Sequence, residues 1–210
     1  MNSFTITKDK EYLEQDIQAY YNAKYTRQGE EGHPDYLNVL KNTFDSFPDT
    51  KLNYASKKLE SVLKSDLPKI YKKLKYDSLS VCVVPRAKAE KTYSKKQLLF
   101  KSTIQSVVQQ LDDFNDGTTY IIRNSDTKTT HLKSEIKRYD GTIFQNNGDS
   151  PYVGITKKTC NLDKKIKDRN ILLIDDVYTK GVNIDEDAIQ ALIDKGAKSV
   201  TFYAVGACGI

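Results

Sequence analysis

Three short runs of almost wholly apolar residues constrain the fold of this chain most strongly. They lie at residues 79–84 (LSVCVV), 171–174 (ILLI) and 199–205 (SVTFYAV). Such runs, without polar alternation, are typical of β-strands buried on both faces. Helical spacing of apolar residues at 100–111 and 184–195 supplies the crossover helices that parallel strands need. The sequence therefore predicts an α/β fold with a three-layer, open, mainly parallel sheet and helices on both faces.

The rest of the chain is divided by its pattern into two parts. Residues 1–77 look helical and hold eight of the fourteen tyrosines, so we expect a helical N-terminal cap over the sheet. Residues 78–210 form the predicted α/β core. Further expected elements are helices at 35–46 and 50–65, a third helix that starts or bends at Pro68, and strands at 118–122 and 151–156.

The composition is that of a globular protein without a membrane anchor. Hydrophobic residues make up 38% and charged residues 29% of the 210 residues. No apolar run approaches the roughly eighteen residues of a membrane helix. The start of the chain lacks the apolar stretch of a secretion signal, so we expect a cytoplasmic protein. The three cysteines show no CxxC spacing, which argues against a disulfide framework or a cysteine zinc site.

The distribution of charge indicates a kind of ligand. Residues 85–101 hold six basic and one acidic side chain, and residues 150–169 hold six and two. Residues 171–195, in contrast, hold two basic and six acidic side chains. Basic segments beside a compact acidic one favour a small phosphorylated ligand held with a divalent cation, because a long polyanion would favour one continuous basic face.

Asp175 and Asp176 follow the second apolar run directly, at the end of a strand where open α/β sheets bind ligands. A short loop with Gly181 then leads into the next predicted helix, whose first N–H groups favour an anion. Carboxylates suit ribose hydroxyls and the hydrated shell of Mg²⁺. The alternative interpretation is a plain strand end, with Asn183 and Glu186 as a helix-capping pair.

Three acidic residues, Asp185, Glu186 and Asp187, open that helix. Acidic side chains favour a first helical turn because of the helix dipole. They would nevertheless repel a phosphate bound at the same helix end. We therefore expect them to point outward, away from the ligand.

Residues 171–183 (ILLIDDVYTKGVN) resemble the phosphoribosyl-pyrophosphate (PRPP) signature of type I phosphoribosyltransferases. That signature has four apolar residues, two acidic residues and a loop that ends in Thr-x-Gly-x-Thr or a close variant. The segment is most similar to ComF-like and orotate enzymes, and Lys180 matches a basic residue of the amidophosphoribosyltransferase branch. Asn183 replaces the final Thr. Thr179 stands where purine-salvage enzymes carry a general-base Asp, which disfavours that branch.

The resemblance implies a type I phosphoribosyltransferase-like fold and a Mg²⁺-dependent reaction of nucleotide metabolism. Ribose 5-phosphate would pass from PRPP to a nitrogen nucleophile, with release of pyrophosphate. Asp175 and Asp176 would hold the ribose hydroxyls, directly or through the metal. The 5-phosphate would be bound by Val177, Tyr178, Thr179, Lys180, Gly181, Val182 and Asn183.

The resemblance also implies roles for basic residues. Arg86 and Lys88 follow the strand at 79–84, where the family places its pyrophosphate loop. Residues 124–151 show little periodicity and occupy the slot of the family's mobile catalytic loop. From that loop Arg138 would cover the pyrophosphate, with His131, Lys133 and Lys137 as further candidates. Each of these residues could instead be an ordinary exposed side chain, and we expect the other histidine, His33, to be a surface residue.

Several questions stay open in the sequence. The family's variable hood selects the acceptor, and residues 1–77 are the candidate hood, but they carry no familiar motif. The acceptor is therefore unnamed, and a homodimer is one option for the quaternary state. A non-catalytic PRPP-sensing regulator or DNA-uptake accessory protein of the same fold is one alternative function. A single-strand nucleic-acid binder is another, disfavoured because residues 1–77 are almost neutral.

Overall fold

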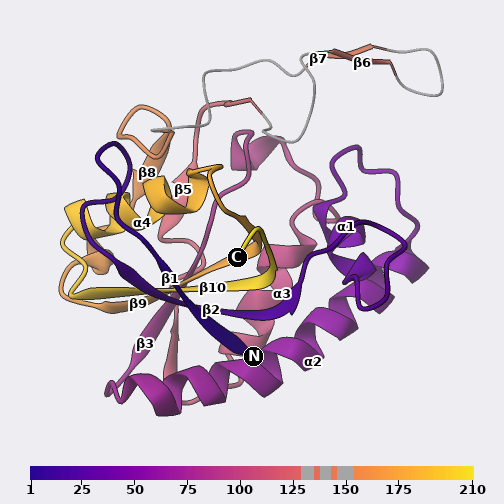
Figure 1. Cartoon of the computed structure of the whole chain (residues 1–210). Coiled ribbons are helices and arrows are strands. Elements are labelled where there is room, and N and C mark those ends of the chain that lie inside the picture. Colours follow the sequence, from indigo (N-terminus) through magenta and orange to yellow (C-terminus); the bar gives the residue numbers. More distant parts are fainter. Residues whose placement is uncertain (129–134, 138–142, 146–153) are drawn as a thin grey trace.

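A six-stranded sheet forms the centre of the molecule, in the order β1-β2-β10-β9-β3-β4 (Figure 1). The computed structural model describes residues 1–128, 135–137, 143–145 and 154–210. All neighbouring strands of this sheet are parallel except β1 and β2. The strands are β1 (Asn2–Ile6), β2 (Ile17–Lys24), β10 (Ser199–Cys208), β9 (Asn170–Thr179), β3 (Leu79–Val83) and β4 (Phe114–Asp116).

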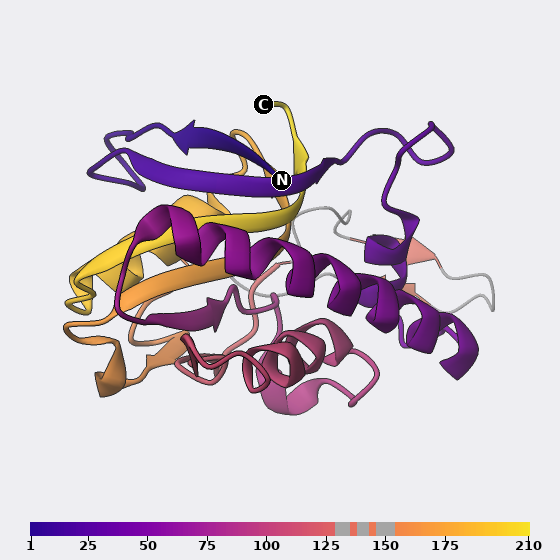
Figure 2. The same cartoon turned by 90° about the horizontal axis from the view of Figure 1, so that it is seen from below.

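Helices cover both faces of this sheet. One core cluster joins α1 (Asp35–Lys41), α2 (Asp49–Leu74) and α3 (Leu99–Val108) to one face. The other core cluster joins α4 (Ile184–Asp194) to the opposite face. Figure 2 shows α2 crossing the strands on its side of the sheet. The prediction of a mixed α/β fold with a mostly parallel, helix-covered sheet is thus confirmed.

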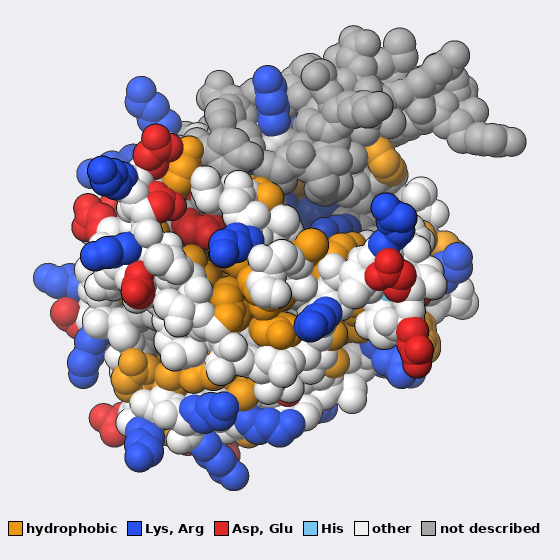
Figure 3. Space-filling model, viewed as in Figure 1, with side chains coloured by type: hydrophobic (Ala, Val, Ile, Leu, Met, Phe, Trp, Pro, Cys, Tyr) orange, Lys and Arg blue, Asp and Glu red, His pale blue; other side chains and the backbone are white. Residues whose placement is uncertain are grey.

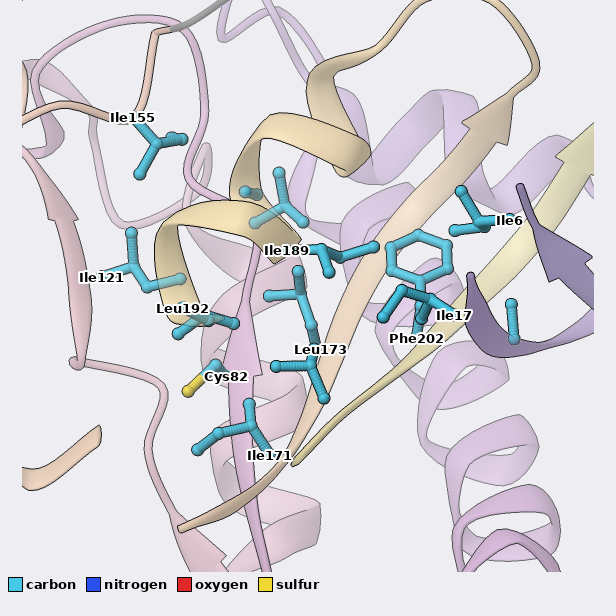
Figure 4. Close-up of a cluster of buried hydrophobic side chains, with 14 of the residues drawn as sticks. Ile6, Ile17, Cys82, Ile121, Ile155, Ile171, Leu173, Ile189, Leu192 and Phe202 are labelled. Atoms are coloured by element: carbon cyan, nitrogen blue, oxygen red, sulfur yellow. The ribbon is translucent and has the colours of Figure 1, made fainter. Parts of the chain in front are cut away.

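The apolar runs fill both cores by simple alternation. In β9, Ile171 and Leu173 face the α4 side, whereas Leu172 and Ile174 face the α2 side. Phe202 in β10 packs on the α4 side with Ile171 and Leu173, as Figure 4 shows. Because successive strand residues point to opposite faces, only a strand between two helical layers can bury every residue of such a run.

The N-terminal part differs from the prediction of a wholly helical segment. Residues 2–24 form β1 and β2, and β2 pairs in parallel with β10. Ile17 and Ala19 of β2 are buried on the α4 side and Tyr20 on the α2 side. Their burial in the sheet prevails over the weak helical pattern of this stretch. Helices begin only at α1.

The region of 50–74 is one helix, not two. Pro68 lies inside α2, where it removes one backbone hydrogen bond. Leu63, Leu67 and Ile70 nevertheless stay buried on the same side, so packing of the apolar stripe maintains the helix through the proline.

Neither this helix nor any other in the described part of the chain is long and apolar enough to cross a membrane.

Of the two weaker strand predictions, the one at 118–122 is confirmed only at its end. There the chain forms β5 (Ile121–Arg123), which pairs with β8 (Cys160–Leu162) outside the main sheet. Of residues 151–156 the structure describes 154–156, and these form no strand. The remaining elements are the antiparallel pair β6 (Glu135–Lys137) and β7 (Ile143–Gln145), and the 3₁₀ turns η1 (Glu90–Thr92) and η2 (Lys164–Ile166).

Candidate functional site

The acidic pair lies in β9, at the carboxyl-end side of the parallel sheet. Asp175 and Asp176 are both partly buried. The strand does not end there, since it pairs with β10 as far as Thr179 opposite Cys208. The pair is therefore held in a hydrogen-bonded strand, and of the seven predicted phosphate-binding residues the first three, Val177 to Thr179, belong to that strand.

Tyr178 is one of these three, and its side chain faces the core. It is buried against Phe4 and Phe202, with ring centroids 5.0 and 5.8 Å away. Its hydroxyl donates a hydrogen bond to Glu186 Oε1 over 2.9 Å. Only its backbone is therefore available to a ligand.

A tight turn over Lys180–Asn183 connects β9 to α4. The Val182 N–H donates to the Thr179 carbonyl over 3.1 Å. Gly181 and Asn183 have positive φ values of 84° and 63°, a conformation that glycine and asparagine adopt most readily. Nothing lies within 4 Å of where a Cβ of Gly181 would be, so the turn is open at that residue.

The turn presents the first N–H groups of α4, which have no partner within the helix. Asn183 occupies the N-cap position, but its side chain makes no capping hydrogen bond. Glu186 is engaged with Tyr178 instead. The capping-pair interpretation is therefore not supported, and the Asn183 amide remains near the helix end.

The acidic residues that open α4 do not point outward, contrary to expectation. Asp185, Glu186 and Asp187 are all buried, with exposed fractions of 5%, 4% and 8%. Asp187 Oδ2 accepts hydrogen bonds from the N–H groups of Gly154 and Ile155, over 2.5 and 2.9 Å. The Asp187 carboxylate therefore holds the backbone at Gly154 and Ile155 against the first turn of α4.

Asp185 turns toward Asp175, and the two carboxyl groups are hydrogen-bonded to each other. Burial, followed by the nearby charge of Asp176, raises the pKa of Asp175 to about 7. Burial and the charge of Asp175 raise the pKa of Asp185 well above its usual value. The interaction between the two carboxyl groups lowers the pKa of Asp175 and raises that of Asp185, which favours the protonated form of Asp185.

Lys41, at the end of α1, reaches the same place from the N-terminal segment. Its Nζ lies 3.8 Å from Asp176 Oδ2. The negative charge of Asp176 is the main reason why the pKa of Lys41 is raised. No motif marked Lys41, because its helix comes close to Asp176 only through folding.

Arg86 and Lys88 lie in the loop that follows β3, the strand beside β9. The Val84 N–H donates to the Ile174 carbonyl over 3.0 Å, which holds the start of this loop against β9. Arg86 donates to the Gln97 carbonyl and stacks 4.5 Å from the Tyr93 ring centroid. Lys88 Nζ donates to the Thr127 carbonyl over 3.0 Å. Arg86 lies close enough to Lys41 for its positive charge to lower the pKa of Lys41. Lys88, in contrast, is directed toward Thr127.

Arg123, which the sequence did not single out, ties this loop to α4. Its buried guanidinium donates to the Arg86 carbonyl over 2.7 Å and to the Gly154 carbonyl over 3.1 Å. Gly154 is also held by Asp187. Two sides of the site are therefore linked through one arginine.

Most of the remaining predicted residues lie in the part of the chain that the structure does not describe. Arg138, His131 and Lys133 lie outside the described residues, as does the side chain of Lys137. His33 is not a surface residue, since its side chain is only 2% exposed. Its ring lies 4.8 Å from that of Tyr25, and its Nε2 is 3.1 Å from Asn38 Nδ2.

The donor set of the acidic pair suits a hard cation such as Mg²⁺, because it consists of carboxylate oxygens. Asp185 Oδ1 is buried without a hydrogen-bond partner in the described structure. Among the described residues, however, no group of three or more His, Cys, Asp or Glu side chains is arranged to bind a metal ion. A magnesium ion here would therefore take most of its ligands from water and from a bound phosphate compound, as Mg²⁺ commonly does.

The raised pKa values of Asp175 and Asp185 predict a pH dependence of stability. The folded protein binds protons at Asp175 more tightly than the unfolded chain, where Asp titrates near 4. Stability should therefore fall as the pH rises from 5 to 8, by about 1–3 kcal/mol in the free energy of unfolding. Urea denaturation at several pH values measures it. Asp185→Asn, which removes one carboxyl group of the pair, should flatten the dependence, and an equal slope in that variant would contradict the interpretation.

No protein-family model and no curated protein sequence matches this chain.

Proposed function

We propose that the protein is a Mg²⁺-dependent phosphoribosyltransferase. It would transfer ribose 5-phosphate from PRPP to a small nitrogenous acceptor and release pyrophosphate. The proposal includes a type I phosphoribosyltransferase-like fold, on the ComF-like and amidophosphoribosyltransferase-like side of that family. Residues 1–77 would then be the family's variable hood, with β1 and β2 built into the sheet edge.

One observation carries the proposal: the acidic pair, a basic residue of the loop after β3 and the open turn before α4 lie at one end of the sheet. Asp175 and Asp176 come from β9, and Arg86 comes from the loop after the adjacent strand β3. The open turn at Gly181 leads into the N-terminus of α4. PRPP carries ribose hydroxyls between a 5-phosphate and a pyrophosphate group. Such a ligand needs carboxylates, a helix N-terminus and a basic side chain close together.

The residues would act by binding and by orientation. Asp175 and Asp176 would hold the ribose hydroxyls, and the turn at 180–183 would bind the 5-phosphate through backbone N–H groups. Arg86 would stabilise the negative charge that grows on the departing pyrophosphate. A magnesium ion, when bound with PRPP, would neutralise part of that charge. The acceptor nitrogen would then form a bond to the anomeric carbon of the ribose, while the bond between that carbon and the pyrophosphate oxygen breaks.

The raised pKa of Asp185 supports this proposal. Three buried carboxylates at the helix end would repel a 5-phosphate if all were charged. Burial favours the protonated, neutral form of Asp185, and the charge of Asp187 is compensated in part by two N–H donors and by nearby Arg123. The charge facing a phosphate is therefore smaller than the sequence alone implies.

The experiment is to incubate the full chain with PRPP, Mg²⁺ and a panel of purine bases, pyrimidine bases and ammonia, and to follow pyrophosphate. We expect release at least tenfold above the rate without protein for one acceptor. Calorimetry with PRPP and Mg²⁺ provides a second readout. Absence of both binding and release would refute the proposal.

The regulatory alternative predicts a different pair of results. Asn183 replaces the hydroxyl residue that ends the family signature, and a sensor needs only to bind. Binding of PRPP without pyrophosphate release for any acceptor would favour this alternative.

Nucleic-acid binding is less well supported. On the face drawn in Figure 3, Lys and Arg side chains are scattered among acidic and apolar ones and form no continuous basic stripe. A protein that tracks a nucleic-acid backbone uses a continuous basic surface. A salt titration against a single-stranded oligonucleotide tests this reading, and no binding at low salt would remove it.

A further inference from the structure

Lys41 places a positive charge beside the acidic pair. Its Nζ lies 3.8 Å from Asp176 Oδ2 and 5.4 Å from the centroid of the Tyr25 ring. A lysine side chain ends in an ammonium group, which is positively charged at neutral pH. A cation of the chain itself thus lies beside a carboxylate that the proposed function assigns to the ligand.

The contact between Lys41 and Asp176 is loose. The distance of 3.8 Å exceeds that of a hydrogen bond, and the side chains are 26% and 23% exposed. Ion pairs of this kind contribute little to stability. The ammonium, on its four-carbon stem, can therefore exchange Asp176 for another anion without cost to the fold.

The backbone that carries Lys41 is, in contrast, firmly held. Asn42 ends α1 in a left-handed conformation, and its side chain accepts the N–H of Ser46 over 3.1 Å. Gln97 Nε2 donates to the carbonyls of Asn42 and Thr43, over 3.3 and 3.0 Å. The carbonyl of Gln97 accepts from Arg86. One residue, Gln97, therefore binds both the backbone that follows Lys41 and the guanidinium of Arg86.

We propose that Lys41 is an anion-binding residue of this site. Without a ligand its ammonium group pairs with Asp176, and when a ligand binds it pairs with the pyrophosphate group of that ligand. The inference rests on the proposed function for the identity of the ligand. No sequence motif carries it, since it comes from the position of α1.

Two opposite effects follow from this exchange. A divalent cation without a phosphate ligand must compete with the Lys41 ammonium for Asp176, so Lys41 weakens its binding. A diphosphate that brings the cation with it neutralises Asp176 and offers its own oxygens to Lys41 and Arg86, so Lys41 strengthens its binding. A residue with only a structural role would change both affinities in the same direction.

The test is calorimetric titration of the full chain with Mn²⁺ alone, and with inorganic pyrophosphate in the presence of Mn²⁺. For Lys41→Met we expect Mn²⁺ alone to bind at least about fivefold more tightly and pyrophosphate at least about tenfold more weakly. Lys41→Arg, which keeps the charge, should remain within about threefold of the wild type for pyrophosphate.

Lys73→Met is the matched control. Lys73 also lies in the last turn of a helix, with Nζ 5.5 Å from the ring centroid of Tyr20, but it is on α2. We expect it to change neither affinity. Three results would overturn the assignment. They are unchanged affinities in Lys41→Met, a change of both affinities in the same direction, and no binding by any variant.

The result also separates this inference from the proposed function. Opposite shifts in Lys41→Met without pyrophosphate release from PRPP would support the role of Lys41 and refute the transferase. Pyrophosphate release by the wild type with unchanged affinities in Lys41→Met would refute the role of Lys41 alone.

Discussion

Replacing both Asp175 and Asp176 by Asn should reduce pyrophosphate release at least about 1,000-fold while the chain stays folded. Both positions would lose the charge that holds the ribose hydroxyls and the metal, and single electrostatic contacts at active sites commonly contribute a hundredfold or more. The fold should tolerate the change, because Asn has the same shape and burial already disfavours the charged form of Asp175. Initial rates with saturating PRPP and the best acceptor measure the effect.

Asp112→Asn with Asp113→Asn is the matched control, since these adjacent acidic residues are exposed and lie between α3 and β4. This variant should keep full activity. Circular dichroism and thermal unfolding establish that both double variants are folded. Turnover that persists in the Asp175/Asp176 variant would count decisively against the transferase.

Phe202→Ala should cost about 3–5 kcal/mol in the free energy of unfolding. Phe202 is fully buried in β10, in the core between the sheet and α4, and its ring meets that of Tyr178 edge-on at 5.8 Å. Truncation leaves a cavity that neighbouring strands, tied by backbone hydrogen bonds, cannot close. Urea denaturation monitored by circular dichroism gives the value.

Phe44→Ala serves as its control, because Phe44 is 37% exposed. Its replacement should cost less than about 1 kcal/mol. A similar loss of stability in the two variants would mean that the α4 side of the sheet is not a close-packed core.

The central strands were predictable because their sequences leave little choice. The runs in β3, β9 and β10 have no polar face, and only a strand between two helical layers suits them. The strands β1 and β2 were not predictable in the same way. Their residues mix polar and apolar types. The strand conformation of β2 depends on pairing with β10, the last strand in the sequence, and β1 in turn pairs with β2.

The site divides along similar lines. Asp175, Asp176 and the turn at Gly181 form one continuous stretch, so the sequence identified them as a unit. Lys41 and Arg123 reach the site from other elements and carry no local signal. For Asp185 a signal existed in the acidic run that opens α4, but the sequence could not show that its carboxyl group would interact with that of Asp175.

The segment that bears Lys41 joins β2 to α2, and both of these elements are packed into the cores of the sheet. Mutations at the exposed positions of residues 25–48 can therefore accumulate without disturbing the scaffold, whereas Leu37 and Leu40 belong to the core. Evolution, or a library built by a protein engineer, has in this stretch a place to alter substrate choice separately from folding.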